Sequence, residues 1–378
     1  MRSTFIDVLN DSDGSPLSLF HVYRLIDKRQ YTDELQFFGK AFGDQLDWIV
    51  GGFYLDERPT GINGTAQRAF VHPGVVTRLA EDFRSTKSKA AFGQIGYDLS
   101  SLLQGLKFDL GYRYTWDEGS TCAVRSVETA PPVSEQDCIP SGGTPGNAQS
   151  TAPTWTVGLN NKPIDDLLLY ATTRRGYRSA GFNSPQFAPV FAVYQNYGPE
   201  KLTDFELGIK SDWRVGDWRG RTNLAAYTGK HEGIQRSITL TANMDGDNNP
   251  ANDPSTMILN AAEATISGAE LEVMIAPTEQ LRFTLNGSYT DARYDKFEAP
   301  TIFVPLLGAN PVTNRFSYTP KSTLGGGVRY TVPMQSHGEL AFNANYFWSD
   351  QVWYVERPLD INGIQPSFGL LNLRADWI

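Results

Sequence analysis

The sequence predicts an all-β protein, an antiparallel transmembrane β-barrel, on three observations. Segments that alternate apolar and polar residues recur along the whole chain. The connections between these segments alternate between short and long. Aromatic residues, 12% of the chain, concentrate where segments approach the long connections. Outer-membrane barrels have short periplasmic turns, long extracellular loops and aromatic girdles, so the three observations together favour this class.

Composition and charge argue against several other classes of protein. The chain has 378 residues, a net charge of -9 and a pI near 5.1, which argues against nucleic-acid binding. Its longest near-continuous apolar run, 48–55, is far short of the roughly 20 residues that a membrane-spanning helix needs. The opening residues contain no apolar signal core. Since an outer-membrane protein requires a signal peptide, we expect the true N-terminus to lie upstream.

Thirteen strands are predicted in order, after a polar segment 1–29 that we interpret as a loop. The strands are 30–39, 46–57, 85–98, 106–117, 152–160, 167–176, 201–213, 219–234, 259–276, 281–294, 317–332, 339–354 and 368–378. The short connections are 41–45, 99–105, 161–166, 215–217, 277–280 and 333–338. The long connections are 58–84, 118–151, 177–200, 235–258, 295–316 and 355–367.

Each predicted strand separates its side chains onto two faces. In the segment 281–289, Leu281, Phe283 and Leu285 fall on one face, and Arg282 and Thr284 on the other. The segment 106–117 repeats this pattern, with Lys107, Asp109 and Arg113 on its polar face. A half-buried strand of a soluble protein gives the same alternation. Charge on the polar face suits a wet barrel interior better than a packed core.

The two cysteines, Cys122 and Cys138, lie in one polar, proline-containing connection. Nothing around them resembles a CxxC motif, and a disulfide between them would fasten a surface loop in an oxidising compartment. The alternative is two unrelated free thiols; we predict the disulfide. The four histidines are scattered and have no metal-ligand spacing.

Several stretches, in order, resemble the β-barrel of TonB-dependent outer-membrane receptors. These are YTDEL at 31–35 with LDWIVGGFY at 46–54, LYA at 169–171 with RGYRSAGFN at 175–183, YGPE at 197–200 with FELGIKS at 205–211, ISGAELE at 266–272, and NLR at 372–374. The resemblance covers nearly the whole chain, so residues 1–378 are interpreted as one partial receptor-like barrel domain.

The resemblance implies a barrel of about 22 strands closed by an N-terminal plug, which takes up scarce nutrients with energy from an inner-membrane complex. The plug, the energy-coupling box and the terminal aromatic strand of the family are not found in this sequence. The thirteen strands would therefore be strands 8 to 20 of a longer receptor. The implied partners are the TonB complex through the plug, the lipid bilayer and its lipopolysaccharide, and a small-molecule ligand such as an iron chelate.

The candidate ligand-binding residues lie where the strand 167–176 meets its long connection. They are Arg174, Tyr177, Arg178, Phe182, Tyr194 and Tyr197, with Arg175, Phe187 and Phe191 nearby. Arginine forks and aromatic rings suit an anionic or aromatic ligand such as a ferric chelate. The same residues suit contact with lipopolysaccharide phosphates, or a structural role at the barrel rim. These alternatives stay open at the level of sequence.

Other candidate sites have less support in the sequence. The loop 245–253 clusters Asp and Asn residues, but Pro250 and Thr256 break the calcium-loop pattern, so turn chemistry explains it better. Charged residues on the polar strand faces would face the plug; they are Lys107, Glu206, Arg113, Lys210, Glu270, Glu272, Arg282 and Arg329. No catalytic constellation assembles from the spacing, and no cofactor is indicated.

We therefore expect an outer-membrane receptor for energy-coupled uptake, with a ferric siderophore as the substrate, in a Gram-negative bacterium. A passive porin-type channel is the first alternative, and a plug domain upstream would exclude it. A soluble secreted β-protein that binds carbohydrate through its aromatics is the second. Recovery of the parent protein without detergent would favour that second alternative.

Overall fold

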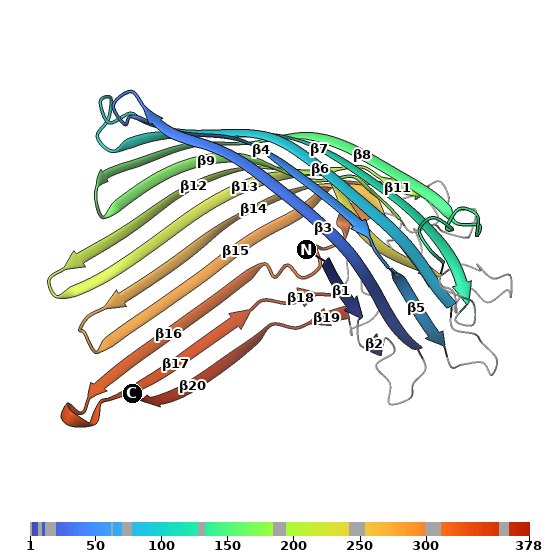
Figure 1. Ribbon diagram of the computed structural model, residues 1–378. Helices are drawn as coiled ribbons and strands as arrows, with labels where there is room; N and C mark the ends of the chain where they lie inside the picture. The colour runs from blue at the N-terminus through green and yellow to red at the C-terminus, as the bar shows by residue number, and fades with distance from the viewer. Residues whose placement is uncertain are drawn as a thin grey trace.

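The computed structural model describes residues 2–6, 10–11, 20–61, 63–69, 78–127, 133–183, 194–241, 254–298, 311–354 and 363–378. Over these residues the chain forms a 16-stranded antiparallel sheet that curves into the wall of an open barrel (Figure 1). Sheet order follows chain order, so each long strand pairs with the next long strand. Within the described residues the two edges of the sheet do not pair, and the barrel is not closed.

The bounds of the elements are as follows. The long strands are β3 (Phe20–Ala41), β4 (Leu46–Pro59), β6 (Arg78–Asp98), β7 (Leu106–Val127), β8 (Thr144–Ile164), β9 (Leu167–Arg178), β12 (Glu200–Val215), β13 (Trp218–Thr241), β14 (Pro254–Ala276), β15 (Leu281–Phe297), β16 (Ser322–Pro333), β17 (Glu339–Ser349) and β20 (Phe368–Trp377). The short elements are β1 (Arg2–Ile6), β2 (Asn10–Asp11), β5 (Gly64–Ala69), β10 (Gly181–Phe182), β11 (Asn196–Tyr197), β18 (Val352–Trp353), β19 (Ile364–Gln365) and the 3₁₀ turns η4 (Pro311–Thr313) and η5 (Gln335–His337). No helix in the described ranges is long and apolar enough to cross a membrane.

All thirteen predicted strands are confirmed, and so is the alternation of their connections. The short connections gather at one end of the sheet, at the left of Figure 1, and the other connections lie at the opposite end. Two of the short turns contain a glycine with the left-handed backbone that favours this residue: Gly216 between β12 and β13 has φ +60°, and Gly43 between β3 and β4 has φ +66°. The fold therefore places the short and the long connections at opposite ends of the sheet.

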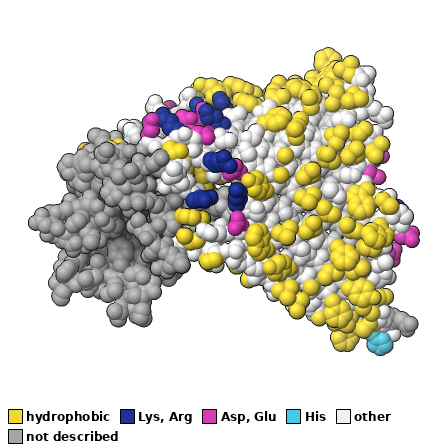
Figure 2. Space-filling model, turned by 180° about the vertical axis from the view of Figure 1, so that it is seen from behind, with side chains coloured by type: hydrophobic (Ala, Val, Ile, Leu, Met, Phe, Trp, Pro, Cys, Tyr) yellow, Lys and Arg dark blue, Asp and Glu magenta, His cyan; other side chains and the backbone are white. Residues whose placement is uncertain are grey.

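The convex face of the sheet is apolar and open to the surroundings. Leu207 on β12 stands opposite Ala171 on β9 and Ala226 on β13, and directly opposite residues share a face. Leu207 is 50% exposed, and other large apolar side chains continue its face over the neighbouring strands. Figure 2 shows this apolar surface across much of the sheet. A soluble monomer rarely exposes so large a patch, so this face meets lipid or a partner.

The strands extend further toward the loop end than the sequence predicts. The predicted loop 1–29 is wrong for residues 2–6, 10–11 and 20–29, which are strand: β1 pairs with Leu25–Arg29, and β3 begins at Phe20. Likewise β7 runs to Val127 and β8 begins at Thr144, inside a predicted long connection. These extensions lack the strict alternation of apolar and polar residues by which a strand is recognised from sequence.

Two strands, β16 and β17, are shorter than predicted. The segment 317–321 is a turn in which Tyr318 has φ +56°, and Pro320 follows, so β16 begins only at Ser322. A left-handed residue and a proline both interrupt strand pairing. At the same end of this hairpin, β17 stops at Ser349, opposite Thr323, and Trp353 belongs to the separate small strand β18.

Buried residues gather at the loop end. One cluster joins β13, β14 and β15 and consists of Ile234, Ile238, Met257, Leu259, Ala262, Ala264, Tyr294 and Phe297. At its margin the guanidinium of Arg236 lies over the rings of Tyr294 and Phe316, 5.5 and 5.2 Å from their centroids. A second, smaller cluster of Phe83, Val124 and Cys138 surrounds the disulfide. These cores hold the strand extensions together beyond the apolar wall.

Candidate functional site on the inner wall

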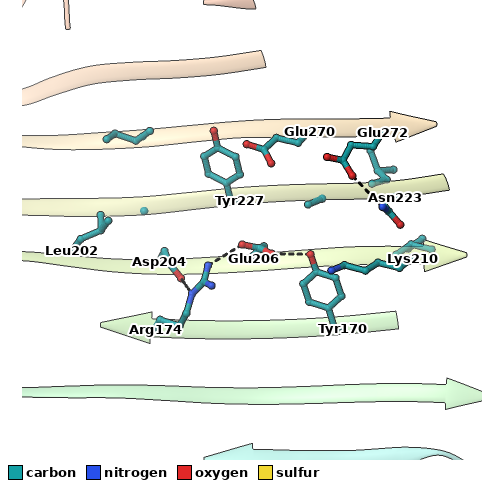
Figure 3. Close-up of a pocket in the computed structure, with 15 residues that line it drawn as sticks. Tyr170, Arg174, Leu202, Asp204, Glu206, Lys210, Asn223, Tyr227, Glu270 and Glu272 are labelled. Atoms are coloured by element: carbon teal, nitrogen blue, oxygen red, sulfur yellow. Dashed lines mark hydrogen bonds and ion pairs between the residues drawn. The ribbon is translucent and has the colours of Figure 1, made fainter. Parts of the chain in front are cut away.

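Strand alternation places a polar cluster on the concave face of β9, β12, β13 and β14, behind the apolar surface. We call it the inner-wall cluster (Figure 3); it comprises Tyr170, Arg174, Asp204, Glu206, Lys210, Asn223, Tyr227, Glu270 and Glu272. These residues line a hollow of about 510 Å³. Their side chains alternate with the outward-facing Leu207 and Ile209 of β12, so one strand supplies both an apolar and a charged surface.

Arg174 is the centre of the cluster. Its Nε lies 3.0 Å from Asp204 Oδ1, and its Nη2 lies 2.8 Å from Glu206 Oε2. The Tyr170 hydroxyl donates to Glu206 Oε1 at 2.7 Å, on the side away from Arg174. Strand register creates this arrangement, since Arg174 stands directly opposite Asp204 and Tyr170 opposite Gly208. A Cβ at position 208 would overlap the Tyr170 ring, so the glycine leaves room for the ring to cross β12.

The remaining charges give the cluster an acidic excess. Arg174 and Lys210 contribute +2, and Asp204, Glu206, Glu270 and Glu272 contribute -4, for a net charge of -2. Asn223 donates to Glu272 at 3.1 Å, and Lys210 Nζ lies 5.7 Å from the centroid of the Tyr170 ring. Glu270 is exposed. The surface therefore suits a cationic or hydrogen-bonding partner rather than an anion.

A different part of the inner wall is basic. Arg282 on β15 stands directly opposite Arg329 on β16, and Arg374 on β20 continues this sector next to Asp376. Arg113 on β7 lies over the rings of Phe53 and Phe92, at 5.1 and 5.6 Å. The charged residues that the sequence assigns to the polar face thus form separate acidic and basic sectors. Their contact with a plug stays a prediction.

The six predicted ligand-binding residues do not form one surface. Arg174 belongs to the inner-wall cluster, whereas Arg178 is exposed at the end of β9, opposite Glu200. The Tyr177 hydroxyl donates to Asp117 Oδ2 at 2.7 Å and lies 2.6 Å from Ser150 Oγ, so it joins β9 to neighbouring strands. Of these three side chains, Arg174 and Arg178 are the most open to a ligand.

Phe182, Tyr194 and Tyr197 have packing roles. Phe182 is 6% exposed and lies beneath the guanidinium of Arg84, 5.0 Å from the centroid of its ring. Tyr197 pairs with Gly181 between the short strands β11 and β10. Tyr194 packs against the buried cluster of β13–β15. Phe187, Phe191 and the loop 245–253 lie outside the described residues.

The stretches GFN at 181–183 and PE at 199–200 join the β9–β12 connection to the β13–β14 hairpin. We call this set of contacts the clasp. Asn183 is 4% exposed; its Nδ2 donates to the carbonyls of Tyr194 (2.7 Å) and Ile258 (2.9 Å). Its Oδ1 accepts from the Ile258 amide at 2.6 Å. Glu200 accepts from the Gln235 amide at 2.7 Å and lies 2.8 Å from His231 Nε2. The sequence predicts these motifs only as a resemblance to the family. Their role in the clasp is not predicted, because single buried polar residues have no periodic pattern.

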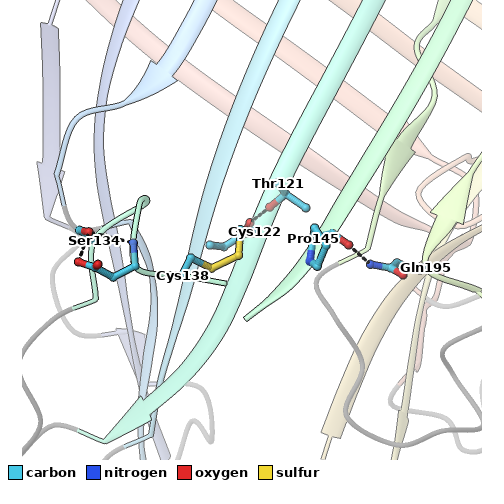
Figure 4. Close-up of a disulfide and its surroundings, with 8 residues drawn as sticks. Thr121, Cys122, Ser134, Cys138, Pro145 and Gln195 are labelled. Atoms are coloured by element: carbon cyan, nitrogen blue, oxygen red, sulfur yellow. Dashed lines mark hydrogen bonds between the residues drawn. A yellow bond between two sulfur atoms is a disulfide. The ribbon is translucent and has the colours of Figure 1, made fainter. Parts of the chain in front are cut away.

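Cys122 and Cys138 are joined by a disulfide that fastens the β7–β8 connection (Figure 4). Cys138 is fully buried and packs with Phe83 and Val124. Beyond the disulfide, Gln195 Nε2 donates to the Pro145 carbonyl at 3.0 Å, which ties the start of β8 to the segment before β11. The loop is thus held by a disulfide on one side and by a hydrogen bond on the other.

The fold and the site define a wall that is apolar outside and charged inside, with long connections at one end. That architecture belongs to transmembrane β-barrels. The family model for the TonB dependent receptor-like β-barrel matches residues 4–378. The chain therefore belongs to the TonB-dependent receptor β-barrel family.

Solved structures show the same fold. The ferric yersiniabactin uptake receptor FyuA from Yersinia pestis aligns with 100% of this chain and 49% of its own, at 16% identity and TM-score 0.69. The ferric preacinetobactin receptor BauA from Acinetobacter baumannii aligns with 99% of this chain and 51% of its own, at 15% identity and TM-score 0.58. The copper transporter OprC aligns with 97% and 50%, at 15% identity and TM-score 0.62. The chain spans about half the length of these proteins.

Proposed function

We propose that the chain is the barrel wall of an outer-membrane receptor that takes up a ferric siderophore with energy from the TonB complex. The inner-wall cluster is the observation that carries this proposal. A plug seated in the barrel would need fixed polar contacts on the wall, and a tyrosine, an arginine and two carboxylates bonded into one group would supply them. Solved relatives of about twice the length include receptors named for ferric siderophores, which supports the substrate class.

The plug, in this proposal, contacts both sectors of the inner wall. A basic segment would lie against Glu270 and Glu272, and an acidic one against Arg282 and Arg329. The ligand would enter from the loop end, past Arg178 at the end of β9. The acidic excess of the inner-wall cluster then favours a plug contact over direct binding of an anionic chelate at that level.

The test is uptake by a deletion strain of the parent bacterium. We expect that strain to lose growth on an iron-loaded siderophore in iron-limited medium, and the complemented strain to regain it. A protonophore should abolish uptake of the ⁵⁵Fe-loaded chelate, because the transport is energy-coupled. Normal chelate uptake in the deletion strain rejects the siderophore proposal.

The relative named as a copper transporter makes copper the second candidate substrate. Uptake of copper by the same strains, measured by elemental analysis, separates the two metals.

A passive porin would show uptake that resists the protonophore. A secreted carbohydrate-binding protein would appear in the soluble fraction, so fractionation of the parent cells tests both the location and the class.

A further inference from the structure

The bridge between Cys122 and Cys138 lies where the sequence leaves the pairing of two strands open. Beyond residue 117, the stretch 118–121 of β7 pairs with the stretch 146–149 of β8. Every side chain in these two stretches is small or polar. Register is strongly specified only where one face of a strand is apolar and buried, so a slipped pairing of these stretches would cost little.

The wall parts of the same two strands are different. Between residues 106 and 117, outer apolar side chains such as Leu110 alternate with inner polar ones such as Asp109 and Arg113. A slip of one residue would turn the charged side chains to the apolar face. A slip of two residues would shift the apolar band by about 7 Å along the neighbouring strand. The wall therefore fixes its own register, whereas the polar extensions above it need another constraint.

The bridge leads directly into the start of β8 (Figure 4). The Cys138 carbonyl accepts a hydrogen bond from the Gly143 amide at 2.8 Å, and Thr144 begins β8 directly after it. Gly142, with φ +85°, lies in the turn between them. Once Cys138 is joined to Cys122 of β7, this short turn brings Thr144 to its observed place in the ladder. The bridge thus supplies the constraint that the side-chain pattern lacks.

The folded protein covers the two sulfur atoms. Cys138 is fully buried, and Phe83 and Val124 pack with it. A Cβ at Gly143 would overlap both sulfurs, so the main chain itself lies against the bridge. The bridge also lies at the loop end of the sheet, opposite the short connections (Figure 1). In an outer-membrane barrel the short connections face the periplasm, so the folded bridge lies away from the compartment of the thiol oxidases.

We propose that the Cys122–Cys138 bridge closes in the periplasm before β7 and β8 pair, and that it then sets the register of their polar extensions. One cysteine thiolate attacks the disulfide of a periplasmic thiol oxidase, and the second displaces the enzyme from the mixed disulfide. The two receptor thiols are oxidised, and the enzyme disulfide is reduced to two thiols, which take up the two protons. The inference rests on the proposed outer-membrane location but not on the proposed substrate.

The first experiment follows the order of events in cells that make the parent receptor. At intervals after a radioactive pulse, cells are dissolved in cold detergent with N-ethylmaleimide, and unheated gel migration separates folded from unfolded receptor. Each band is denatured in the same reagent, and thiols released by reduction are counted with a maleimide polymer. We expect unfolded, bridged receptor to precede folded receptor. Folded receptor that first carries two free thiols and is oxidised later would overturn the proposal.

The second experiment measures register in the bridge-free variant Cys122→Ser/Cys138→Ser. In that background, Ser120→Cys/Asn147→Cys reports the observed pairing, because these residues stand opposite each other. Ser120→Cys/Gln149→Cys reports a slip of two residues. We expect the slipped pair to form its crosslink within about threefold of the yield of the observed pair, since polar strands specify register weakly.

The wall of the same hairpin supplies the matched control. In the bridge-free background, Gly111→Cys/Thr156→Cys reports the observed pairing there, and Gly111→Cys/Gly158→Cys reports the same slip. The observed pair should exceed the slipped pair by at least about tenfold, because alternation fixes this register. An equally strong preference in the polar extensions would overturn the proposed role of the bridge. Chelate uptake is a separate assay, so failure of the uptake proposal is distinguishable from failure of this one.

Discussion

At the scale of the residue, the face of the strand decides what a side chain does. Arg174 and Arg178 lie four residues apart on β9, on the same face. Arg174 is held by Asp204 and Glu206, whereas Arg178 projects at the strand end without a bonded partner in the described residues. Residue type alone suggests one ligand site for both arginines. In the structure, Arg174 is fixed by its contacts on the inner wall, whereas Arg178 is an exposed cation at the end of the strand.

Gly208 gives a prediction at this scale. Gly208→Val should cost about 1–3 kcal/mol of unfolding free energy, because the new side chain overlaps the Tyr170 ring and displaces it from Glu206. The measurement is urea unfolding of the receptor in lipid vesicles. Gly176→Val is the matched control, since nothing lies within 4 Å of a Cβ at that position of β9. Equal destabilisation by both substitutions would contradict the assigned role of Gly208.

Asn183 gives a second prediction. Asn183→Ala should destabilise the clasp by roughly 1–3 kcal/mol, since it leaves the Tyr194 and Ile258 carbonyls and the Ile258 amide without their partner. Faster hydrogen exchange at the Ile258 amide is the direct readout. Asn147→Ala, an exposed asparagine on β8, should leave that rate unchanged. Unaltered exchange in Asn183→Ala would mean that the clasp is held by other contacts.

At the scale of the element, sequence predicted the wall well and the loop end poorly. Alternation identified each long strand because lipid and water impose opposite requirements on its two faces. Beyond the apolar wall the two faces of a strand no longer differ in this way. The sequence therefore predicts a loop for β5 and for the part of β7 after residue 117. The clasp of Asn183 was missed for another reason: its partner Ile258 lies 75 residues away, and a single buried amide has no period.

The disulfide belongs to this scale because it fixes a whole connection. Cys122→Ser/Cys138→Ser should lower the stability of the β7–β8 connection by about 3 kcal/mol, the value for closing a loop of this length. We expect limited proteolysis to cut the segment 133–143 faster in this variant than in the wild type. Dithiothreitol should produce the same cleavage in the wild type and no further change in the variant. Resistance of the double variant would show that Gln195 and the buried cluster suffice.

At the scale of the whole molecule, one sheet separates two environments. The outer face is apolar, the inner face has an acidic and a basic sector, and the loop end has small cores of its own. The membrane interpretation requires that the two faces respond oppositely to the same substitution. Neighbouring alanines on β13 allow this comparison: Ala225 lines the inner-wall hollow, opposite Glu270, and Ala226 lines an apolar hollow of the outer face.

Ala226→Arg should therefore cost about 2–4 kcal/mol in a lipid bilayer, because it places a charge on the lipid face of the wall. Ala225→Arg should be tolerated or slightly stabilising, because the new guanidinium comes close to Glu270 in a polar setting. Unfolding from vesicles of defined thickness measures both variants on one scale. If the outer face instead binds a soluble partner, Ala226→Arg should lose its penalty when the partner is absent. Equal penalties for the two variants would contradict the assignment of faces, and with it the placement of the inner-wall cluster toward a plug.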